Sequence, residues 1–211
     1  MESVVHVFEH GDLVAGHPAL DLVNTATAWD QPVPVDWLGN YDSLIDWAAL
    51  AGVVEVEEAA VLRRSARAHP DLATVALADA RGLRDALREV ATDLITMRSP
   101  AAGSLLKLET RWKAAVGRSC LAAAKVPGLL VLKNAPSHLE VIGDRTALRA
   151  VDLFHAFPAH RARICRGTYC GWLFIDTSKG GRRVWCDMAT CGNAAKSRRH
   201  RHRHEGASAR V

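Results

Sequence analysis

The stretch CRGTYCGWLFIDTSKGGRRVWCDMATCGN, residues 165–193, contains four of the five cysteines of the chain. Cys165 and Cys170 form one pair, Cys186 and Cys191 form a second pair, and four residues separate the cysteines within each pair. Such spacing lets a tight turn direct two thiolates at one ion, and four thiolates complete the tetrahedral coordination of Zn²⁺. We therefore predict one structural zinc ion with no open coordination position for hydrolytic chemistry.

The segment between the two cysteine pairs has the pattern of a β-hairpin. Residues 172–175 and 183–185 are strand-like, and residues 178–181 have the composition of a turn. After Cys191 the sequence NAAKSRRHRHRH predicts a helix that begins at the second cysteine pair. The predicted order is knuckle, β-hairpin and helix, which resembles a treble-clef finger, and zinc binding is expected to supply most of its folding free energy.

The charge of the chain is divided unevenly along its length. Residues 159–211 contain 12 Lys and Arg but only three Asp and Glu, a net charge of +9. The remaining 15 basic and 20 acidic side chains give residues 1–158 a net charge of −5. A basic segment of this kind favours contact with a polyanion, most commonly nucleic acid. We therefore predict two domains, 1–158 and 159–211, with the boundary at Pro158.

Basic side chains surround most of the helix predicted over residues 191–204, and two more lie on the predicted hairpin. The candidate phosphate-binding residues are Arg182, Arg183, Lys196, Arg198, Arg199, Arg201 and Arg203. A helix that is polar on every face gains little by folding alone, so we expect bound phosphates to stabilise its far half. The alternatives are a solvated basic tail and a finger that binds another protein.

Residues 1–158 are predicted to be mainly helical. Apolar residues at three- and four-residue steps predict helices over residues 16–29, 41–52, 55–68, 71–98, 104–115 and 144–157. LLVLK, residues 129–133, and LEVI, residues 139–142, are predicted to pair as a minor β-hairpin. Cys120, which lies outside the cysteine block, is expected to be a buried, unreactive thiol. The predicted fold class is mainly α, with a small zinc finger at the C-terminal end.

Four residues of the first predicted helix are candidates for a small-ligand pocket: Asp21, Asn24, Thr25 and Trp29. The preferred interpretation is simpler, because Asp and Asn at such positions commonly cap or hydrogen-bond neighbouring backbone. The sequence contains no Ser-His-Asp set, HExxH motif or glycine-rich phosphate loop that would indicate an enzyme. No apolar stretch reaches the length of a membrane span and no signal peptide is evident, so we expect a cytoplasmic protein.

The residues around the second cysteine pair resemble the CGNR zinc-finger family. The match is WCDMATCGN, residues 185–193, preceded by LFIDTSKGGRR, residues 173–183. LDLVNT, residues 20–25, resembles the entry motif of the helical ABATE domain that precedes the finger in that family. One position departs from the family pattern, because the arginine of the family name is Ala194 here.

The resemblance implies a bacterial transcription regulator whose finger binds DNA. Any phosphate or base contact made by the missing arginine would then have to come from Lys196, Arg198 or Arg199. The acidic helical domain would sense a small-molecule effector or form a homodimer. Two other classes of function remain open: a protein-interaction module that docks an acidic partner, and a helical domain that binds or converts a small molecule.

Overall fold

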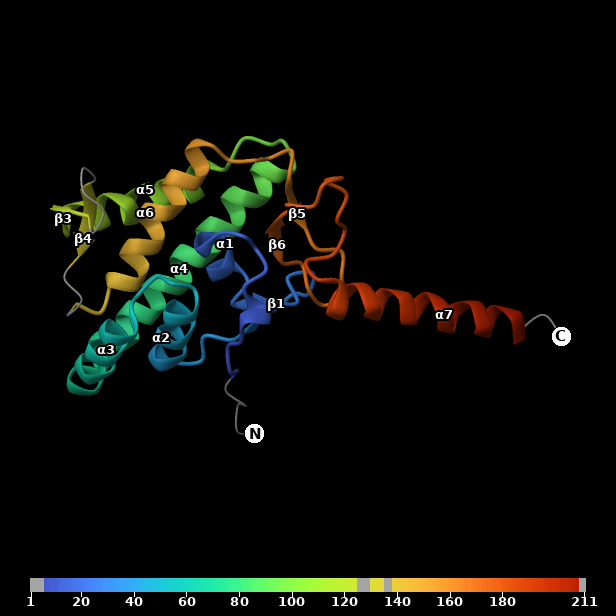
Figure 1. Ribbon diagram of the computed structural model, residues 1–211, viewed down its shortest axis with the longest axis horizontal. Coiled ribbons are helices and arrows are strands. Elements are labelled where there is room, and N and C mark those ends of the chain that lie inside the picture. The colour runs from blue at the N-terminus through green and yellow to red at the C-terminus, as the bar shows by residue number, and fades with distance from the viewer. Residues whose placement is uncertain (1–5, 125–129, 135–137, 209–211) are drawn as a thin grey trace.

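A long central helix, α4 (Pro70–Ile95), organises the fold of residues 6–124, 130–134 and 138–208, which this computed structural model describes. Around it pack α1 (Pro18–Val23), α2 (Tyr41–Leu50), α3 (Val56–Ala68), α5 (Ala102–Gly117) and α6 (Val141–His155) (Figure 1). A short 3₁₀-helix, His10–Asp12, precedes them. The zinc-finger region follows with strands β5 (Ala162–Ile164) and β6 (Leu173–Ile175), a π-helical turn at Met188–Gly192, and α7 (Asn193–Ser208). The predicted mainly α fold is confirmed.

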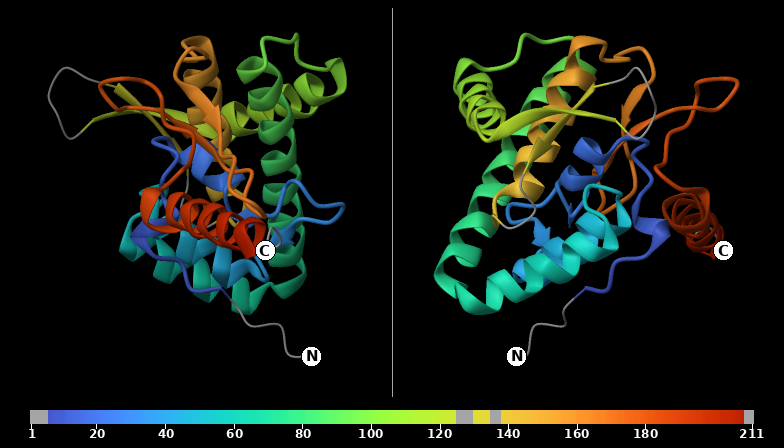
Figure 2. Two further views of the ribbon diagram at one scale, coloured as in Figure 1. Left: turned by 90° about the vertical axis from the view of Figure 1, so that its right-hand side faces the viewer. Right: turned by 60° about the vertical axis from the view of Figure 1, so that its left-hand side comes forward.

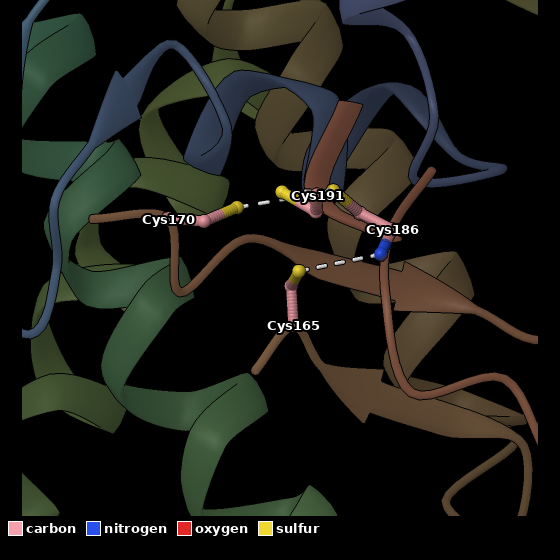
Figure 3. Close-up of side chains that lie close together, drawn as sticks. All are labelled: Cys165, Cys170, Cys186 and Cys191. Carbon is pink, nitrogen blue, oxygen red and sulfur yellow. Dashed lines mark hydrogen bonds between the residues drawn. The ribbon is translucent and has the colours of Figure 1, made fainter. Parts of the chain in front are cut away.

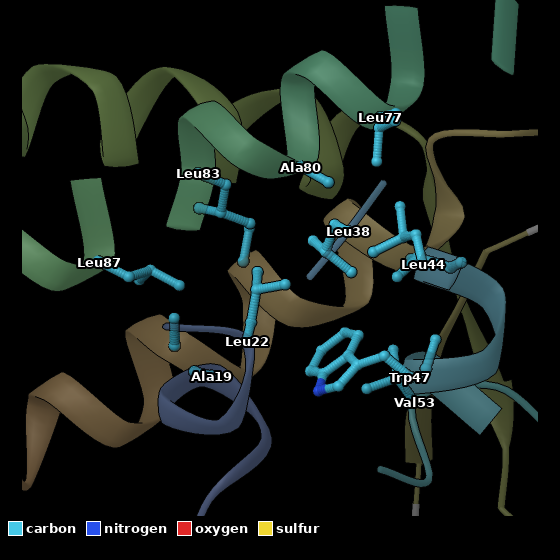
Figure 4. Packing of buried hydrophobic residues seen from close by; sticks show 14 of the residues in the cluster. Ala19, Leu22, Leu38, Leu44, Trp47, Val53, Leu77, Ala80, Leu83 and Leu87 are labelled. Carbon is cyan, nitrogen blue, oxygen red and sulfur yellow. The ribbon is translucent and has the colours of Figure 1, made fainter. Parts of the chain in front are cut away.

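The main hydrophobic core lies where α1 and α2 meet the central helix. Figure 4 shows Leu22 of α1 facing Leu83 of α4, with Trp47 of α2 on its other side. All three side chains are buried. Burial of a side chain of this size stabilises the fold by about 1.5–3 kcal/mol. The apolar stripes predicted for these helices therefore form the hydrophobic core, as expected.

Helix α1 is shorter than the sequence predicts. The prediction covered residues 16–29, but the helix begins at Pro18, with the His17 side chain accepting a hydrogen bond from the Ala19 amide, and it ends at Val23. The chain then forms β1 (Ala26–Thr27), which pairs antiparallel with β2 (Val35–Asp36). The helix ends early because polar contacts with the C-terminal region hold the following residues, as described below.

The minor hairpin of the helical region has a different pair of strands from those predicted. β4 (Leu130–Asn134) pairs antiparallel with β3 (Ser119–Ala123), and not with residues 139–142. Val141 and Ile142 instead form the first turn of α6 and are buried in the core. The prediction of a strand over residues 139–142 is therefore wrong. The apolar residues that suggested a strand are instead buried as part of a helix.

Cys120 lies in β3 opposite Lys133 and is exposed, so the prediction of a buried thiol is also wrong. The hairpin stands at the end of the molecule opposite α7 (Figure 1), and the next residue, Leu121, on the other face of the two-stranded sheet, is exposed as well. Among the described helices, none combines the length and apolar composition of a membrane span.

Helix α7 projects from the side of the molecule that carries β5 and β6 (Figure 1). Figure 2, left, faces this helix and shows the helical body behind it. The predicted boundary at Pro158 falls between α6 and β5. Hydrogen bonds between residues before this boundary and residues after it hold the finger against the helices. They are described with the metal centre below.

Candidate metal centre and basic helix

The first cysteine pair lies in the loop that joins β5 to β6. The two strands are antiparallel, with Ile164 opposite Leu173. The Cys165 amide donates to the Trp172 carbonyl at 2.7 Å, and the Cys170 amide donates to the Gly167 carbonyl at 3.2 Å. These backbone bonds turn both thiols toward the same point.

The partner of β6 differs from the predicted one. Residues 183–185 form no strand, and residues 162–164, which precede the first cysteine, pair with β6 instead. Asp176 explains the difference, because its carboxylate accepts hydrogen bonds from the Ser178 and Arg183 amides and closes the intervening loop without a strand ladder. A hydrogen bond from the Ser178 hydroxyl, together with these amide bonds, holds the pKa of Asp176 down, at about 2.

The second cysteine pair lies at the start of α7, as predicted. Asp187 caps the turn, with its carboxylate accepting hydrogen bonds from the amide and hydroxyl of Thr190. The π-helical turn carries Cys191 and continues directly into α7. The metal site and the basic helix therefore share one continuous segment.

The four thiol groups meet in a geometry that fits one zinc ion (Figure 3). All four sulfur atoms lie within 4.8 Å of one another. The Cys170–Cys186 and Cys186–Cys191 Sγ–Sγ distances are both 3.8 Å. A tetrahedral ion with Zn–S bonds of about 2.3 Å places its sulfur ligands about 3.8 Å apart. The donor set therefore suits a closed structural site.

Gly167 makes this packing possible. A Cβ atom at this position would lie 2.6 Å from the Cys191 Sγ and 3.3 Å from the Cys170 Cβ. A sulfur ligand cannot give way without leaving its place around the ion. The knuckle therefore requires glycine at position 167 for reasons of space.

Hydrogen bonding within the cysteine cluster separates the pKa values of its thiols. Hydrogen bonds from Cys170 and Cys186, with others from the Cys186 and Gly167 amides, lower the pKa of Cys165 far below its ordinary value. The hydrogen bond to Cys165 raises the pKa of Cys170, and burial raises that of Cys191. The protein alone favours a thiolate at Cys165, and zinc replaces the protons on the other ligands.

Direct hydrogen bonds join the finger to the residues that follow α1 and to the central helix. Asn24 donates to the Leu173 carbonyl and accepts from the Leu173 amide, both at 2.9 Å. The Trp172 indole donates to the Ala26 carbonyl at 2.8 Å. Arg88 donates to the Gly171 carbonyl, from α4. The finger is thus fixed against both α1 and the central helix.

The remaining candidate ligand residues are also engaged locally. The Asp21 carboxylate accepts from the Ala15 amide at 3.0 Å, the Thr25 hydroxyl donates to the Leu22 carbonyl at 2.7 Å, and the Trp29 indole donates to the Ala26 carbonyl at 3.0 Å. The preferred interpretation, hydrogen bonding to neighbouring backbone, is confirmed for Asp21, whereas the backbone partner of Asn24 is the distant Leu173. A role in ligand binding stays a prediction. The sequence carried no signal for the role of Arg88.

The predicted phosphate-binding residues lie in two different settings. On α7, Lys196, Arg199 and Arg201 are exposed, Arg198 is half-buried, and Arg203 lies further along the helix. In the loop before Cys186, Arg182 is exposed.

Arg183 differs from the other predicted phosphate-binding residues because it has structural contacts. It donates to the Cys186 carbonyl, and its guanidinium lies 4.8 Å from the centre of the Phe174 ring. Arg183 therefore supports the metal loop, whereas the exposed side chains of α7 are available to a partner.

Comparison with known families agrees with this geometry. Residues 161–204 match the CGNR zinc finger, and residues 16–157 match the ABATE family, described as "Putative stress-induced transcription regulator". The chain belongs to the ABATE family. In this ABATE protein the finger match and the four clustered cysteines together identify a binding site for one zinc ion. Neither matched family is a family of enzymes, and no curated protein matches the chain.

Proposed function

We propose that this ABATE protein is a zinc-dependent transcription regulator that binds DNA through α7. The observation that carries the proposal is the continuity of the second cysteine pair with a projecting basic helix. The ABATE description and the finger match support a regulatory role and not an enzymatic one. Zinc holds the first turn of the helix, and the exposed basic side chains contact phosphates.

The dimensions and charge of α7 suit a DNA groove. Its 16 residues span about 24 Å. The major groove of B-DNA, about 12 Å wide, admits a helix of this kind. Lys196, Arg199 and Arg201 supply phosphate contacts, which fix the position of a protein on DNA without reading its sequence. Ala194, in place of the arginine of the family motif, makes these side chains the main source of charge near the helix start.

The zinc site determines how α7 is attached to the protein. Cys186 and Cys191 reach the ion from either end of the turn that Asp187 caps, and Arg199 lies 6.0 Å from the centre of the Trp185 ring. Without metal the four thiols have no common bonding partner, so the turn loses its fixed position. DNA affinity should therefore depend on bound zinc.

A paired set of charge substitutions tests the proposal. Lys196→Gln with Arg199→Gln removes two exposed charges from α7, and Arg64→Gln with Arg67→Gln removes two exposed charges from α3. Binding to a mixed-sequence duplex, measured by fluorescence anisotropy, should weaken roughly tenfold or more for the α7 variant only. Equal affinity in both variants would show that α7 is not the DNA-binding surface.

An acidic protein partner is the second candidate, because it would use the same exposed charges. The same assay separates the two functions. The interaction module would be supported if the zinc-loaded protein does not bind DNA at low salt but binds an acidic partner with an affinity that falls as salt rises.

A further inference from the structure

A cleft of about 520 Å³ lies where the end of the central helix meets the finger. Its walls come from three segments: Ile95 and Thr96 at the end of α4, residues 162–166 around the first cysteine, and residues 182–184 before Cys186. The volume falls within the range of small-molecule sites, about 300–1,000 Å³. The cleft therefore joins the helical region to the finger through a space of ligand size.

Four arginines line this cleft without an acidic neighbour in its walls. They are Arg163, Arg166, Arg182 and Arg183. Among the described residues, no carboxylate lies within 4.0 Å, the salt-bridge distance, of any of these four guanidinium groups.

Two of these four guanidinium groups, those of Arg163 and Arg183, donate hydrogen bonds to backbone carbonyl oxygens. Arg163 donates to Ala162 and Gly181, at 2.8 and 3.1 Å, and Arg183 donates to Cys186. Carbonyl oxygens orient a guanidinium group but do not neutralise its charge. The cleft thus concentrates positive charge.

Neutralisation of the zinc centre does not explain this concentration. Four thiolates around Zn²⁺ leave a net charge of −2, and Arg88, which interacts with Cys170, offsets one of these charges, so the centre has use for only one further arginine. Asp187, the acid nearest in sequence to Arg182 and Arg183, accepts hydrogen bonds from Thr190. The Asp176 carboxylate accepts from the Ser178 and Arg183 amides and offsets part of the charge of Arg183 alone. The arginines of the cleft therefore exceed what the surrounding residues require.

We propose that this cleft binds a small organic phosphate with an apolar body. Arginine forks match phosphate oxygens, and the exposed Arg166 and Arg182 leave their donors available. Ile95, Ile164 and Val184 supply an apolar wall that inorganic phosphate would leave uncovered. The ligand therefore carries its charge at one end and a short apolar group at the other.

Ligand binding at the cleft would compete with DNA. Arg182 belongs both to the cleft and to the predicted phosphate-binding set, whereas Arg183 supports the metal loop. A bound organic phosphate would neutralise Arg182 and also touch Ile95 of the helical region. This consequence rests on the proposed DNA-binding function, whereas the binding site itself does not.

Calorimetric titration of the full-length, zinc-loaded protein with phenyl phosphate tests the site. Saturable binding is expected, with weaker binding of inorganic phosphate and none of phenol. Arg166→Gln with Arg182→Gln should lower the affinity for phenyl phosphate roughly tenfold, and Val184→Trp, which fills the cleft, should abolish binding. Arg64→Gln with Arg67→Gln, two exposed positions of α3 that do not line the cleft, serves as the control and should leave phenyl phosphate binding unchanged. Zinc content, measured for every variant, confirms that the finger is folded.

Two outcomes overturn the site: no saturable binding of phenyl phosphate up to ~10 mM, or equal affinity in the Arg166/Arg182 variant and the unaltered protein. A separate titration in the presence of labelled duplex tests the competition. Phenyl phosphate binding by a protein that does not bind DNA would support the site and contradict the proposed function, so the two failures are distinguishable.

Discussion

Asn24 and Leu173, 149 residues apart, exchange two hydrogen bonds of 2.9 Å between the side-chain amide of one and the backbone of the other. Both residues are buried. The Asn24 side chain therefore pairs with the backbone of β6 as a neighbouring strand would. This contact attaches the end of α1 to the finger. The placement of the zinc site against the helical region depends on this contact.

Asn24→Ala should destabilise the protein and loosen the finger. The substitution leaves the Leu173 amide and carbonyl without their partners, which should lower the free energy of unfolding by roughly 2–4 kcal/mol. Chemical denaturation measures this loss, and transfer of zinc to a chelator should become faster. Gln31→Ala, at an exposed position in the same segment, is the control and should change neither quantity. A variant as stable as the control would show that the Asn24 contact does not support the fold.

Gly167→Ala should weaken zinc binding without altering the helical region. The added methyl group would lie 2.6 Å from the Cys191 sulfur, so this ligand must move. We expect zinc affinity to fall roughly tenfold or more in competition with a chromophoric chelator. Gly39→Ala, which meets nothing within 4 Å, is the control. Equal zinc affinity in the two variants would rule out the steric role of Gly167.

Leu22→Ala tests the core where α1 meets α2 and α4. A buried Leu→Ala change costs about 2–5 kcal/mol, depending on how far the cavity collapses. Leu106→Ala, on the exposed face of α5, should cost less than about 0.5 kcal/mol. Similar denaturation midpoints for the two variants would contradict the assignment of Leu22 to the core.

Asp21 should make stability depend on pH. Burial raises the pKa of its carboxyl to about 7, well above the value in an unfolded chain. The folded protein therefore binds a proton that the unfolded chain releases, and stability falls as the pH rises from about 4 to about 7, by up to about 1.4 kcal/mol per unit.

Asp21→Asn keeps an oxygen that can accept from the Ala15 amide but removes the charge. This variant should be more stable than the unaltered protein at pH 8, and the difference should shrink toward zero near pH 4. Thermal unfolding across this range measures the effect. A difference that does not change with pH would exclude the titration of Asp21 as its cause.

The spacing of neighbouring cysteines in the sequence predicted the metal centre. Contacts between residues far apart in the sequence could not be predicted in this way. Cys165, Cys170, Cys186 and Cys191 could be grouped because each pair is separated by a fixed short interval. The helices followed from apolar periodicity in the same way. Each of these patterns is local, and the structure preserves it.

The strand partners were predicted incorrectly, because two segments of similar composition compete for one partner and only packing decides between them. Val141 is equally suited to a strand and to a buried helix turn, and the core takes it into α6. Within the finger, Asp176 caps a loop where a hairpin was expected. The Asn24 contact with Leu173 has no local signature at all.

The most direct test of the central claim is the salt dependence of DNA binding by tag-free protein with measured zinc content. We predict one zinc per chain and a dissociation constant for mixed duplex DNA that rises steeply with salt, with a log–log slope near −0.9 for the association constant per phosphate contacted. Affinity should be lost in Cys186→Ser and after zinc removal. A protein that holds one zinc ion and shows no DNA affinity at low salt would contradict the account.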